Sequence, residues 1–229
     1  MAESLPGESE RLLKTPKYRA WKKDLAANGC RLKSVEVLAD LPKGDGSLLF
    51  ALLKTRVDDP QGRPLPKYAL LRGHAVVIVT EVVNGDTGER RFLMLRQRRI
   101  GHGGDTLEFP AGMLDEDVDD PLGVAVKELA EETGLEVAPG LLFPLCDKPL
   151  YTSPGLDDEA IHFFGCTLEL PGDRYHALEG GETGKAEEGE FIKLGLWEYA
   201  RALPQVDSAQ IRLAFCLWFE RLRGGPSAN

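Results

Sequence analysis

The sequence predicts an α/β protein in which a mixed β-sheet packs between helices, preceded by a small β-rich element. Residues 75–83 are apolar and β-branched, and residues 91–97 form a second apolar run after a Gly- and Asn-containing turn, so the two should pair as a hairpin. Apolar residues at helical spacing predict one helix directly after residue 120 and an amphipathic helix over residues 208–223. Strands followed by helices in this order favour a layered α/β architecture.

The remaining elements follow from the same periodicities. Residues 1–16 are polar and expected to be frayed, whereas residues 18–27 have helical spacing. Further strands are expected at residues 32–41, 48–57, 107–109, 141–145, 161–170 and 191–197. The strands before residue 71 predict a separate β-rich region over residues 1–71, suited to dimerisation or to shielding a substrate, ahead of a main domain over residues 72–223.

Composition limits the kinds of partner that this chain can have. The formal net charge is −9, which argues against a general nucleic-acid-binding protein or a protein that binds anionic membranes. No window approaches the roughly 18 apolar residues of a membrane span, and the N-terminus lacks an apolar signal core. A cytoplasmic location is therefore expected, or an organellar one if a presequence is missing from this sequence.

The helix expected after residue 120 has clear boundaries and a dense acidic face. Asp120 suits the N-cap, Pro121 the first helical position, and Gly134 the position after the last turn. The apolar stripe faces a core, and the other side carries three carboxylates, those of Glu128, Glu131 and Glu132.

Three carboxylates on one helical face repel each other, and only Lys127, four residues before Glu131, relieves the repulsion locally. A hard divalent cation such as Mg²⁺ takes oxygen ligands and often bridges them to substrate phosphates. A solvated acidic face explains the same three residues equally well. From these residues alone, both interpretations stay open.

The whole stretch over residues 112–135 resembles the Nudix box, G-x₅-E-x₇-R-E-U-x-E-E-x-G-U, in which U is aliphatic. The matching residues are Gly112, Glu128, Leu129, Glu131, Glu132, Gly134 and Leu135. The chain departs from the pattern in three ways: Lys127 stands where the family has Arg, one extra residue follows Gly112, and Asp119 replaces the first Glu. Lys makes a poorer hydrogen-bonding fork than Arg, so the departure at Lys127 bears on how the ligating Glu is oriented.

The resemblance extends over roughly residues 17–222. Residues 107–115, the Ser-Pro-Gly at 153–155, the Glu-Thr-Gly at 182–184 and residues 189–193 resemble the plant-type ADP-sugar diphosphatases of the Nudix superfamily. This resemblance implies a Nudix α/β/α sandwich that hydrolyses ADP-ribose or ADP-glucose to AMP and a sugar phosphate. It also implies Mg²⁺ as cofactor, with Mn²⁺ as a substitute, and a homodimer.

The resemblance implies a set of metal ligands and a general base. The ligands carried over are Glu128, Glu132 and the carbonyl oxygen of Ala111, together with Glu131 unless that residue pairs with Lys127. Members of the family that cleave nucleoside diphosphate sugars take a general base and a further metal ligand from an acidic loop at the position before residue 191. Among Glu187, Glu188 and Glu190, position favours Glu190 as the ligand and Glu188 as the base, and the assignment among the three stays open. A solvated acidic loop is the alternative interpretation.

Four other residues are candidates for binding the substrate. Arg99 is suited to a bidentate grip on a phosphate. Glu108 could accept hydrogen bonds from a base or ribose, or form a structural pair with an Arg. Ser153 belongs to a Pro- and Gly-containing loop that is suited to holding the substrate, and Glu159 could assist the metals or the sugar.

Two other functions fit the same residues. One is a Nudix hydrolase acting on another diphosphate, such as UDP-glucose, a dinucleoside polyphosphate or a coenzyme. The other is a non-catalytic sensor of nucleotide sugars, in which the altered box with Lys127 retains binding without turnover. The complete acidic trio favours an enzyme.

Overall fold

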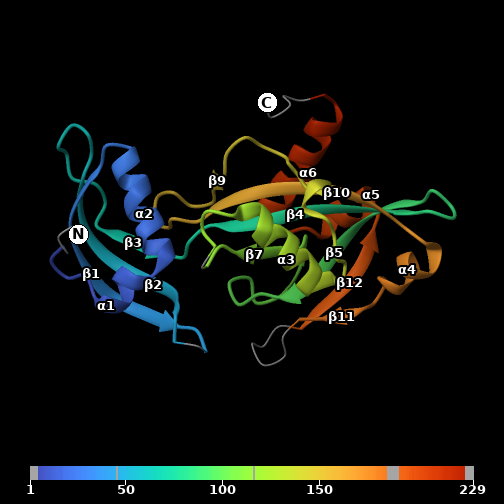
Figure 1. Cartoon of the computed structure of the whole chain (residues 1–229), viewed down its shortest axis with the longest axis horizontal. Helices are drawn as coiled ribbons and strands as arrows, with labels where there is room; N and C mark the ends of the chain where they lie inside the picture. The colour runs from blue at the N-terminus through green and yellow to red at the C-terminus, as the bar shows by residue number, and fades with distance from the viewer. Residues whose placement is uncertain (1–4, 45, 116, 185–190, 225–229) are drawn as a thin grey trace. The chain divides into compact units, whose positions relative to one another are not determined.

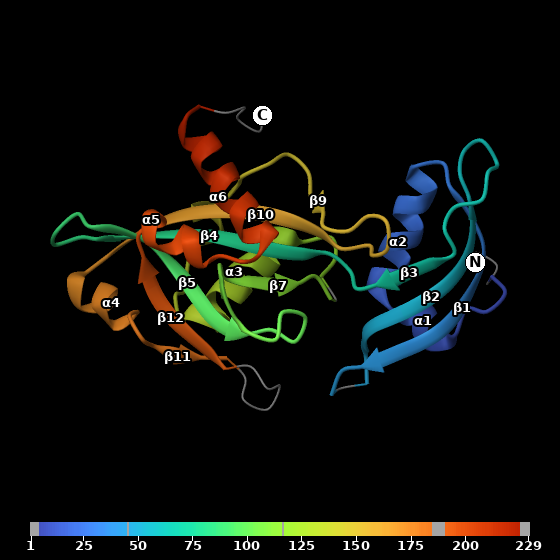
Figure 2. The same cartoon turned by 180° about the vertical axis from the view of Figure 1, so that it is seen from behind.

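The computed structural model describes residues 5–44, 46–115, 117–184 and 191–224 (Figures 1 and 2). The chain forms two compact units. The first unit combines residues 1–75, 113–120 and 150–161, and the second unit combines residues 76–112, 121–149 and 162–229. The first unit is therefore built from three stretches that are far apart in the sequence.

The first unit contains two N-terminal helices and a three-stranded sheet. The helices are α1 (Glu10–Lys14) and α2 (Pro16–Ala27), and the antiparallel strands are β1 (Arg31–Pro42), β2 (Leu48–Asp58) and β3 (Tyr68–Leu71) in the order β1-β2-β3. Leu12 of α1 and Tyr18 of α2 share one buried cluster with Leu53 and Leu71 of the strands. The helices therefore cover one face of this sheet.

Helix α1 corrects the expectation that residues up to 16 are frayed. Ser9 begins the helix, and its hydroxyl accepts a hydrogen bond from the backbone N–H of Leu12 at 3.2 Å. Leu12 is buried, so the helix is held by its contact with the core of the first unit. A helix of five residues has too little periodicity to be recognised from sequence, and packing supplies its stability.

A nine-stranded sheet follows, with β11-β12-β5-β4-β10-β8 as its main order, and β6, β7 and β9 paired to β5, β4 and β10. Its strands are β4 (Ala75–Asn84), β5 (Arg90–Arg98), β6 (Asp105–Glu108), β7 (Ala111–Met113), β8 (Phe143–Pro144), β9 (Leu150–Tyr151), β10 (Ala160–Leu170), β11 (Glu182–Thr183) and β12 (Ile192–Trp197). Strand β4 is buried along almost its whole length, as its continuous apolar sequence predicts.

The predicted hairpin of residues 75–83 and 91–97 is confirmed. Strands β4 and β5 pair antiparallel, with Thr80 opposite Leu93. The side chain of Asn84 accepts hydrogen bonds from the backbone N–H groups of Asp86 and Thr87, and Gly88 takes a positive φ of 74° that suits glycine. The polar turn thus sets the register of the central strands.

Helices α3 (Pro121–Thr133) and α6 (Ala209–Leu222) cover opposite faces of this sheet, because α3 lies in front of it in Figure 1 and α6 lies in front in Figure 2. The expected α/β/α sandwich is confirmed. On the α6 side, the ring of Phe92 lies edge-on to Phe109, Phe215 and Trp218, with centroids 5.9, 5.1 and 6.1 Å apart. Among the described helices, none is both long and apolar enough to span a membrane.

The short elements of the second unit differ from the expectations. The strand expected at residues 141–145 is replaced by a 3-10 turn, η1 (Pro139–Leu141), followed by the two-residue strand β8. Two short helices, α4 (Gly172–Ala177) and α5 (Tyr199–Ala202), have no counterpart in the predicted elements, and a further 3-10 turn, η3 (Leu203–Gln205), follows α5. Pro139 explains the first difference, since its fixed φ starts a turn more readily than a strand.

Candidate active site

Helix α3 carries the acidic face, and its boundaries agree with the sequence prediction. The helix begins at Pro121 and ends at Thr133, after which Gly134 adopts a φ of 71° and donates its N–H to the carbonyl of Ala130 at 2.8 Å. Val124, Ala125 and Leu129 are buried. The buried stripe fixes the rotation of the helix, so Glu128 and Glu132 are half-buried while Glu131 is exposed.

Glu128 packs directly on the backbone of Gly112. A Cβ atom added to Gly112 would lie 2.1 Å from Cδ of Glu128 and 2.4 Å from its Oε1. No side chain other than hydrogen fits at this position without moving the carboxylate. The glycine that opens the box is therefore required for close approach between β7 and the helix, rather than for its own backbone conformation.

Glu132 reaches the same segment from one turn further along the helix. Its Oε2 accepts a hydrogen bond of 2.9 Å from the backbone N–H of Ala111. The carbonyl of Glu132 in turn accepts a 2.7 Å hydrogen bond from the hydroxyl of Thr183 on β11. Two carboxylates at i and i+4 of α3 thus converge on Ala111 and Gly112, and the helix end is fixed against the sheet.

Glu131 points elsewhere and forms the expected alternative contact. Its carboxylate lies 3.7 Å from the ammonium group of Lys127 on the exposed side of the helix. The carboxylates of Glu128 and Glu132 and the backbone oxygen of Ala111 are hard donors of the kind that Mg²⁺ and Mn²⁺ take. In the described part of the chain, no group of three or more His, Cys, Asp or Glu side chains is arranged to hold a metal ion.

The two catalytic residues predicted from the acidic loop, Glu188 and Glu190, lie outside the described residues. The predicted set of ligands is therefore placed only for the helix and for Ala111. Within that set, Glu128 and Glu132 fit a divalent cation because both bring an anionic oxygen to one backbone segment. Glu131 remains a predicted ligand.

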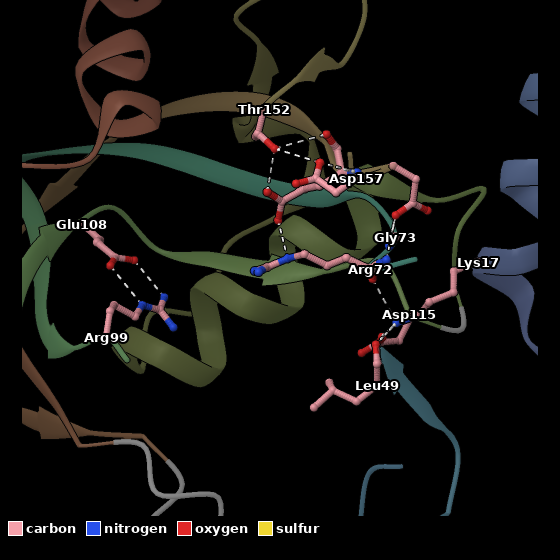
Figure 3. Close-up of polar contacts among 11 residues, drawn as sticks. Lys17, Leu49, Arg72, Gly73, Arg99, Glu108, Asp115, Thr152 and Asp157 are labelled. Atoms are coloured by element: carbon pink, nitrogen blue, oxygen red, sulfur yellow. Dashed lines mark hydrogen bonds and ion pairs between the residues drawn. The ribbon is translucent and has the colours of Figure 1, made fainter. Parts of the chain in front are cut away.

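Arg99 and Glu108, both predicted to bind substrate, are each other's partners (Figure 3). The guanidinium of Arg99 donates from Nε to Oε1 of Glu108 at 3.0 Å and from Nη2 to Oε2 at 2.8 Å. The hydroxyl of Thr106 also donates to Glu108. Glu108 therefore forms the structural pair that was one of its two predicted roles, and Arg99 is held in one orientation.

Glu108 keeps its negative charge although it is largely buried. Burial raises the pKa of a carboxyl group, but the hydrogen bonds and charge of Arg99, with the hydrogen bond from Thr106, bring the pKa of Glu108 below its usual value. Arg99 is 47% exposed at its side chain, so a phosphate can still approach its outer edge. The pair thus presents an oriented cation to the solvent.

Ser153 and Glu159 belong to the first unit, in a loop before β10. The carbonyl of Ser153 accepts hydrogen bonds from the N–H groups of Leu156 and Asp157, which closes the turn. Glu159 is buried, and its carboxylate lies 2.6 Å from Nε of Arg72 and accepts a 3.0 Å hydrogen bond from the hydroxyl of Thr152. Glu159 is therefore part of an ion pair within its own unit.

Asp158 was not a predicted site residue, yet it joins this loop to the backbone between β3 and β4. Its Oδ1 accepts hydrogen bonds from the backbone N–H groups of Arg72, at 2.7 Å, and of Gly73, at 3.0 Å. Burial raises the pKa of Asp158, and the two N–H groups offset only part of that effect. Since Arg72 and Asp158 are 86 residues apart, nothing in the sequence indicates the contact.

Comparison with known proteins agrees with this fold and helix. Residues 72–211 match the family model described as the NUDIX domain. Nudix hydrolase 14, chloroplastic, from Arabidopsis thaliana is 31% identical over 175 residues, which cover 73% of this chain and 56% of that protein. ADP-ribose pyrophosphatase from Mycobacterium tuberculosis is 31% identical over 119 residues, 52% of this chain and 53% of that protein.

Two further comparisons extend the range of relatives. GDP-mannose pyrophosphatase from Salmonella typhi is 33% identical over 130 residues, which cover 54% of this chain and 61% of that protein. A solved structure described as an ADP compounds hydrolase shares the fold, with a TM-score of 0.57 over 85% of this chain and 95% of that chain at 20% identity. The chain thus spans little more than half the length of the curated relatives it matches.

Proposed function

This chain belongs to the NUDIX domain family, and from that membership we propose that it hydrolyses the diphosphate bond of a nucleoside diphosphate sugar, with ADP-ribose and ADP-glucose as the preferred class. The products are AMP and a sugar phosphate, and the proposed cofactor is Mg²⁺, with Mn²⁺ as a substitute. The observation that carries the proposal is the convergence of the Glu128 and Glu132 carboxylates on Ala111 and Gly112.

The names of the relatives support the substrate class. Two of them are named for ADP-ribose and for GDP-mannose, which both contain a diphosphate between a nucleoside and a sugar. The two substrates share the diphosphate and differ in the base. We therefore propose that the diphosphate binds beside α3, near the Glu128 and Glu132 carboxylates that would hold the cation. Residues outside this surface would then select the base.

Each predicted residue has a role in this proposal. Glu128, Glu132 and the Ala111 carbonyl, with Glu190, would hold the divalent cation, which would supply Lewis-acid stabilisation of charge on the diphosphate oxygens. Glu131 would join these ligands only on leaving its ion pair with Lys127. Arg99, oriented by Glu108, binds a phosphate oxygen. Glu188 accepts a proton from the attacking water. Ser153 and Glu159 belong to a loop of the first unit and stay predicted contacts of the substrate.

We also propose that the chain acts as a homodimer in the cytoplasm, through the region of residues 1–71. Each strand of the three-stranded sheet exposes a large apolar side chain, namely Leu41 of β1, Leu52 of β2 and Tyr68 of β3. Exposed apolar side chains on a sheet favour burial against a second surface. Most soluble oligomers are symmetric homo-oligomers, so a second copy is the proposed partner.

A substrate panel tests the proposed function. The purified chain is incubated with Mg²⁺ and, separately, with ADP-ribose, ADP-glucose, GDP-mannose, UDP-glucose and diadenosine polyphosphate, and the products are separated by chromatography. We expect AMP and a sugar phosphate from the two ADP-sugars. Thermal stabilisation by ADP-ribose with Mg²⁺ or Mn²⁺ but without any product would instead identify a sensor.

A further inference from the structure

We propose that Lys17 is a positioning residue for the metal site, because it holds the segment that leaves the box at Asp115. The proposal rests on the proposed function, since it concerns the divalent cation that Glu128 and Glu132 are suited to bind. Lys17 itself contacts neither of these carboxylates in the described hydrogen bonds and ion pairs. Its effect is transmitted along the chain, because Asp115 comes only three residues after Gly112.

Lys17 is a buried cation with every donor in use. Its side chain is 2% exposed, and Nζ donates to the carbonyl of Leu49 at 3.1 Å, the carbonyl of Arg72 at 3.1 Å and Oδ1 of Asp115 at 2.8 Å (Figure 3). An ammonium group has three N–H donors, so its hydrogen-bonding capacity is filled. These partners lie 32, 55 and 98 residues away in the sequence, so one side chain fixes three separate segments.

The segment around Asp115 is held on both sides of its carboxylate. Lys43 forms an ion pair with Oδ2, while Lys17 occupies Oδ1. The preceding residue, Leu114, donates its backbone N–H to the carbonyl of His74 at 2.9 Å. Asp115 is therefore fixed by backbone and side-chain contacts immediately after β7, which contains Ala111 and Gly112.

The backbone between β3 and β4 leaves room for the side chain of Lys17. Gly73 has a φ of 84°, and a Cβ on it would lie 3.1 Å from Cβ of Lys17, so the absence of a side chain makes room for the lysine. Asp158 binds the N–H groups of Arg72 and Gly73 while Lys17 binds the carbonyl of Arg72. The backbone N–H and the carbonyl of Arg72 are thus both hydrogen-bonded.

Burying Lys17 among these segments is unfavourable for the free energy of folding when compared with burying an apolar side chain. Burial of an ammonium group carries a desolvation penalty, and apolar residues of similar volume often stabilise a core as well or better. Unlike an apolar residue, Lys17 forms a hydrogen-bonded ion pair that fixes the position of the Asp115 carboxylate. We therefore assign its main effect to the geometry of the 111–115 segment, on which the Glu128 and Glu132 contacts depend.

Direct metal binding tests this inference without relying on turnover. The dissociation constants of Mg²⁺, by calorimetry, and of Mn²⁺, by electron paramagnetic resonance, are measured for the wild type and for Lys17→Met, each well below its unfolding temperature. We expect the variant to bind both ions on the order of tenfold more weakly, as is typical when the support of a metal ligand is removed. Electrostatics alone predicts the opposite sign, since loss of a positive charge favours a cation.

Lys22→Met is the matched control. Lys22 lies on the same helix and pairs with Glu8, whose side chain is fully buried, but it does not contact the segment at Asp115 in any described hydrogen bond or ion pair. Both substitutions should lower the unfolding temperature, whereas only Lys17→Met should weaken metal binding. Equal weakening in the two variants, or metal binding within twofold of wild type in Lys17→Met, would overturn the proposal.

A second variant covers the case in which Lys17→Met does not fold. Lys17→Gln keeps a hydrogen-bond donor but shortens its reach and removes the charge, and the same loss of metal affinity is expected. If the wild type itself binds neither ion, the proposed function fails. If the wild type binds and the Lys17 variants bind equally well, the proposed function stands and only the positioning role is wrong.

Discussion

Gly112 and Glu128 are in such close contact that a Cβ on the glycine would overlap the Cδ of the carboxylate, at 2.1 Å. The contact joins β7, whose Gly112 opens the box, to the first acidic residue of helix α3. It leaves the Glu128 side chain little freedom, and it places an anionic oxygen against the backbone next to Ala111.

Gly112→Ala should therefore displace Glu128 and weaken the metal site. Gly112 does not have a positive φ, so the effect comes from the added methyl group rather than from backbone strain. We expect the Mg²⁺ concentration for half-maximal hydrolysis to rise at least tenfold, within the range seen when metal ligands lose their orientation. Gly140→Ala, where a Cβ meets nothing within 4 Å, is the control. Unchanged Mg²⁺ dependence in Gly112→Ala would contradict the role of this contact.

Glu132→Gln separates charge from hydrogen bonding. The amide oxygen can still accept from the N–H of Ala111, whereas the negative charge is lost. We expect kcat at a fixed low Mg²⁺ concentration to fall by about 10²-fold, as for a lost metal ligand. Glu131→Gln, at the exposed residue that pairs with Lys127, should cost less. The reverse order of the two effects would make Glu131 the principal ligand.

Arg99→Lys should raise the KM for the nucleotide sugar by about tenfold with a smaller change in kcat. Lysine keeps the positive charge, but its ammonium group cannot form the two parallel hydrogen bonds that Arg99 makes to Glu108. It therefore cannot be held by Glu108 in the orientation that directs a further hydrogen bond to a phosphate. The neighbouring Arg98→Lys, which breaks an exposed pair with Asp105, serves as the control. If Arg99→Lys lowers only the unfolding temperature, the pair with Glu108 is purely structural.

Glu8 should make folding depend on pH in the acid range. Burial raises its pKa, but hydrogen bonds from Lys22, Tyr18 and the N–H of Leu5 lower it below the ordinary value of 4.5. A carboxyl group whose pKa is lowered by folding contributes stability above its unfolded pKa and loses it as the pH falls through its folded pKa. Glu8→Gln should thus lower the unfolding temperature at pH 7 by about 2 to 4 °C. The difference should shrink below pH 4; a difference independent of pH would contradict this assignment.

Leu52→Glu should convert the proposed dimer to a monomer. Leu52 is exposed on β2, in the middle of the three-stranded sheet, and a charge there disfavours burial against a second copy. Light scattering after size-exclusion chromatography should give about twice 25.2 kDa for the wild type and about 25.2 kDa for the variant. Leu141→Glu, at an exposed leucine in η1, should leave the mass unchanged. A monomeric wild type would reject the proposed dimer.

Much of the architecture follows from local sequence because the signals are strong. The β-branched run of β4, the Asn84 turn and the capped helix α3 each specify an element through contacts between near neighbours. Short elements such as α1 and η1 were not predicted, because their stability comes from packing on distant residues or from a single proline.

In the candidate site too, features that depend on residues close in sequence could be predicted, whereas contacts between residues far apart in sequence could not. The acidic face of α3 follows from helical spacing, whereas the contact of Glu128 with Gly112 was not predicted, although both residues belong to the box pattern. The pairing of Arg99 with Glu108 could be anticipated only as one of two roles. The contacts of Lys17 with Asp115 and of Asp158 with Arg72 join residues 98 and 86 positions apart, and a single sequence carries no information on such pairs.

The discontinuous composition of the first unit has a consequence for biosynthesis. Its N-terminal helices and strands are complete early, yet Asp115, Asp158 and Glu159, which bind Lys17 and the Arg72–Gly73 junction, are translated much later. Chains are made at roughly 5–20 residues per second, so these partners reach the nascent chain several seconds after residue 75. During synthesis, Lys17 therefore has no Asp115 carboxylate to bind until that residue is made. The first unit cannot complete its fold until residue 161 has emerged from the ribosome.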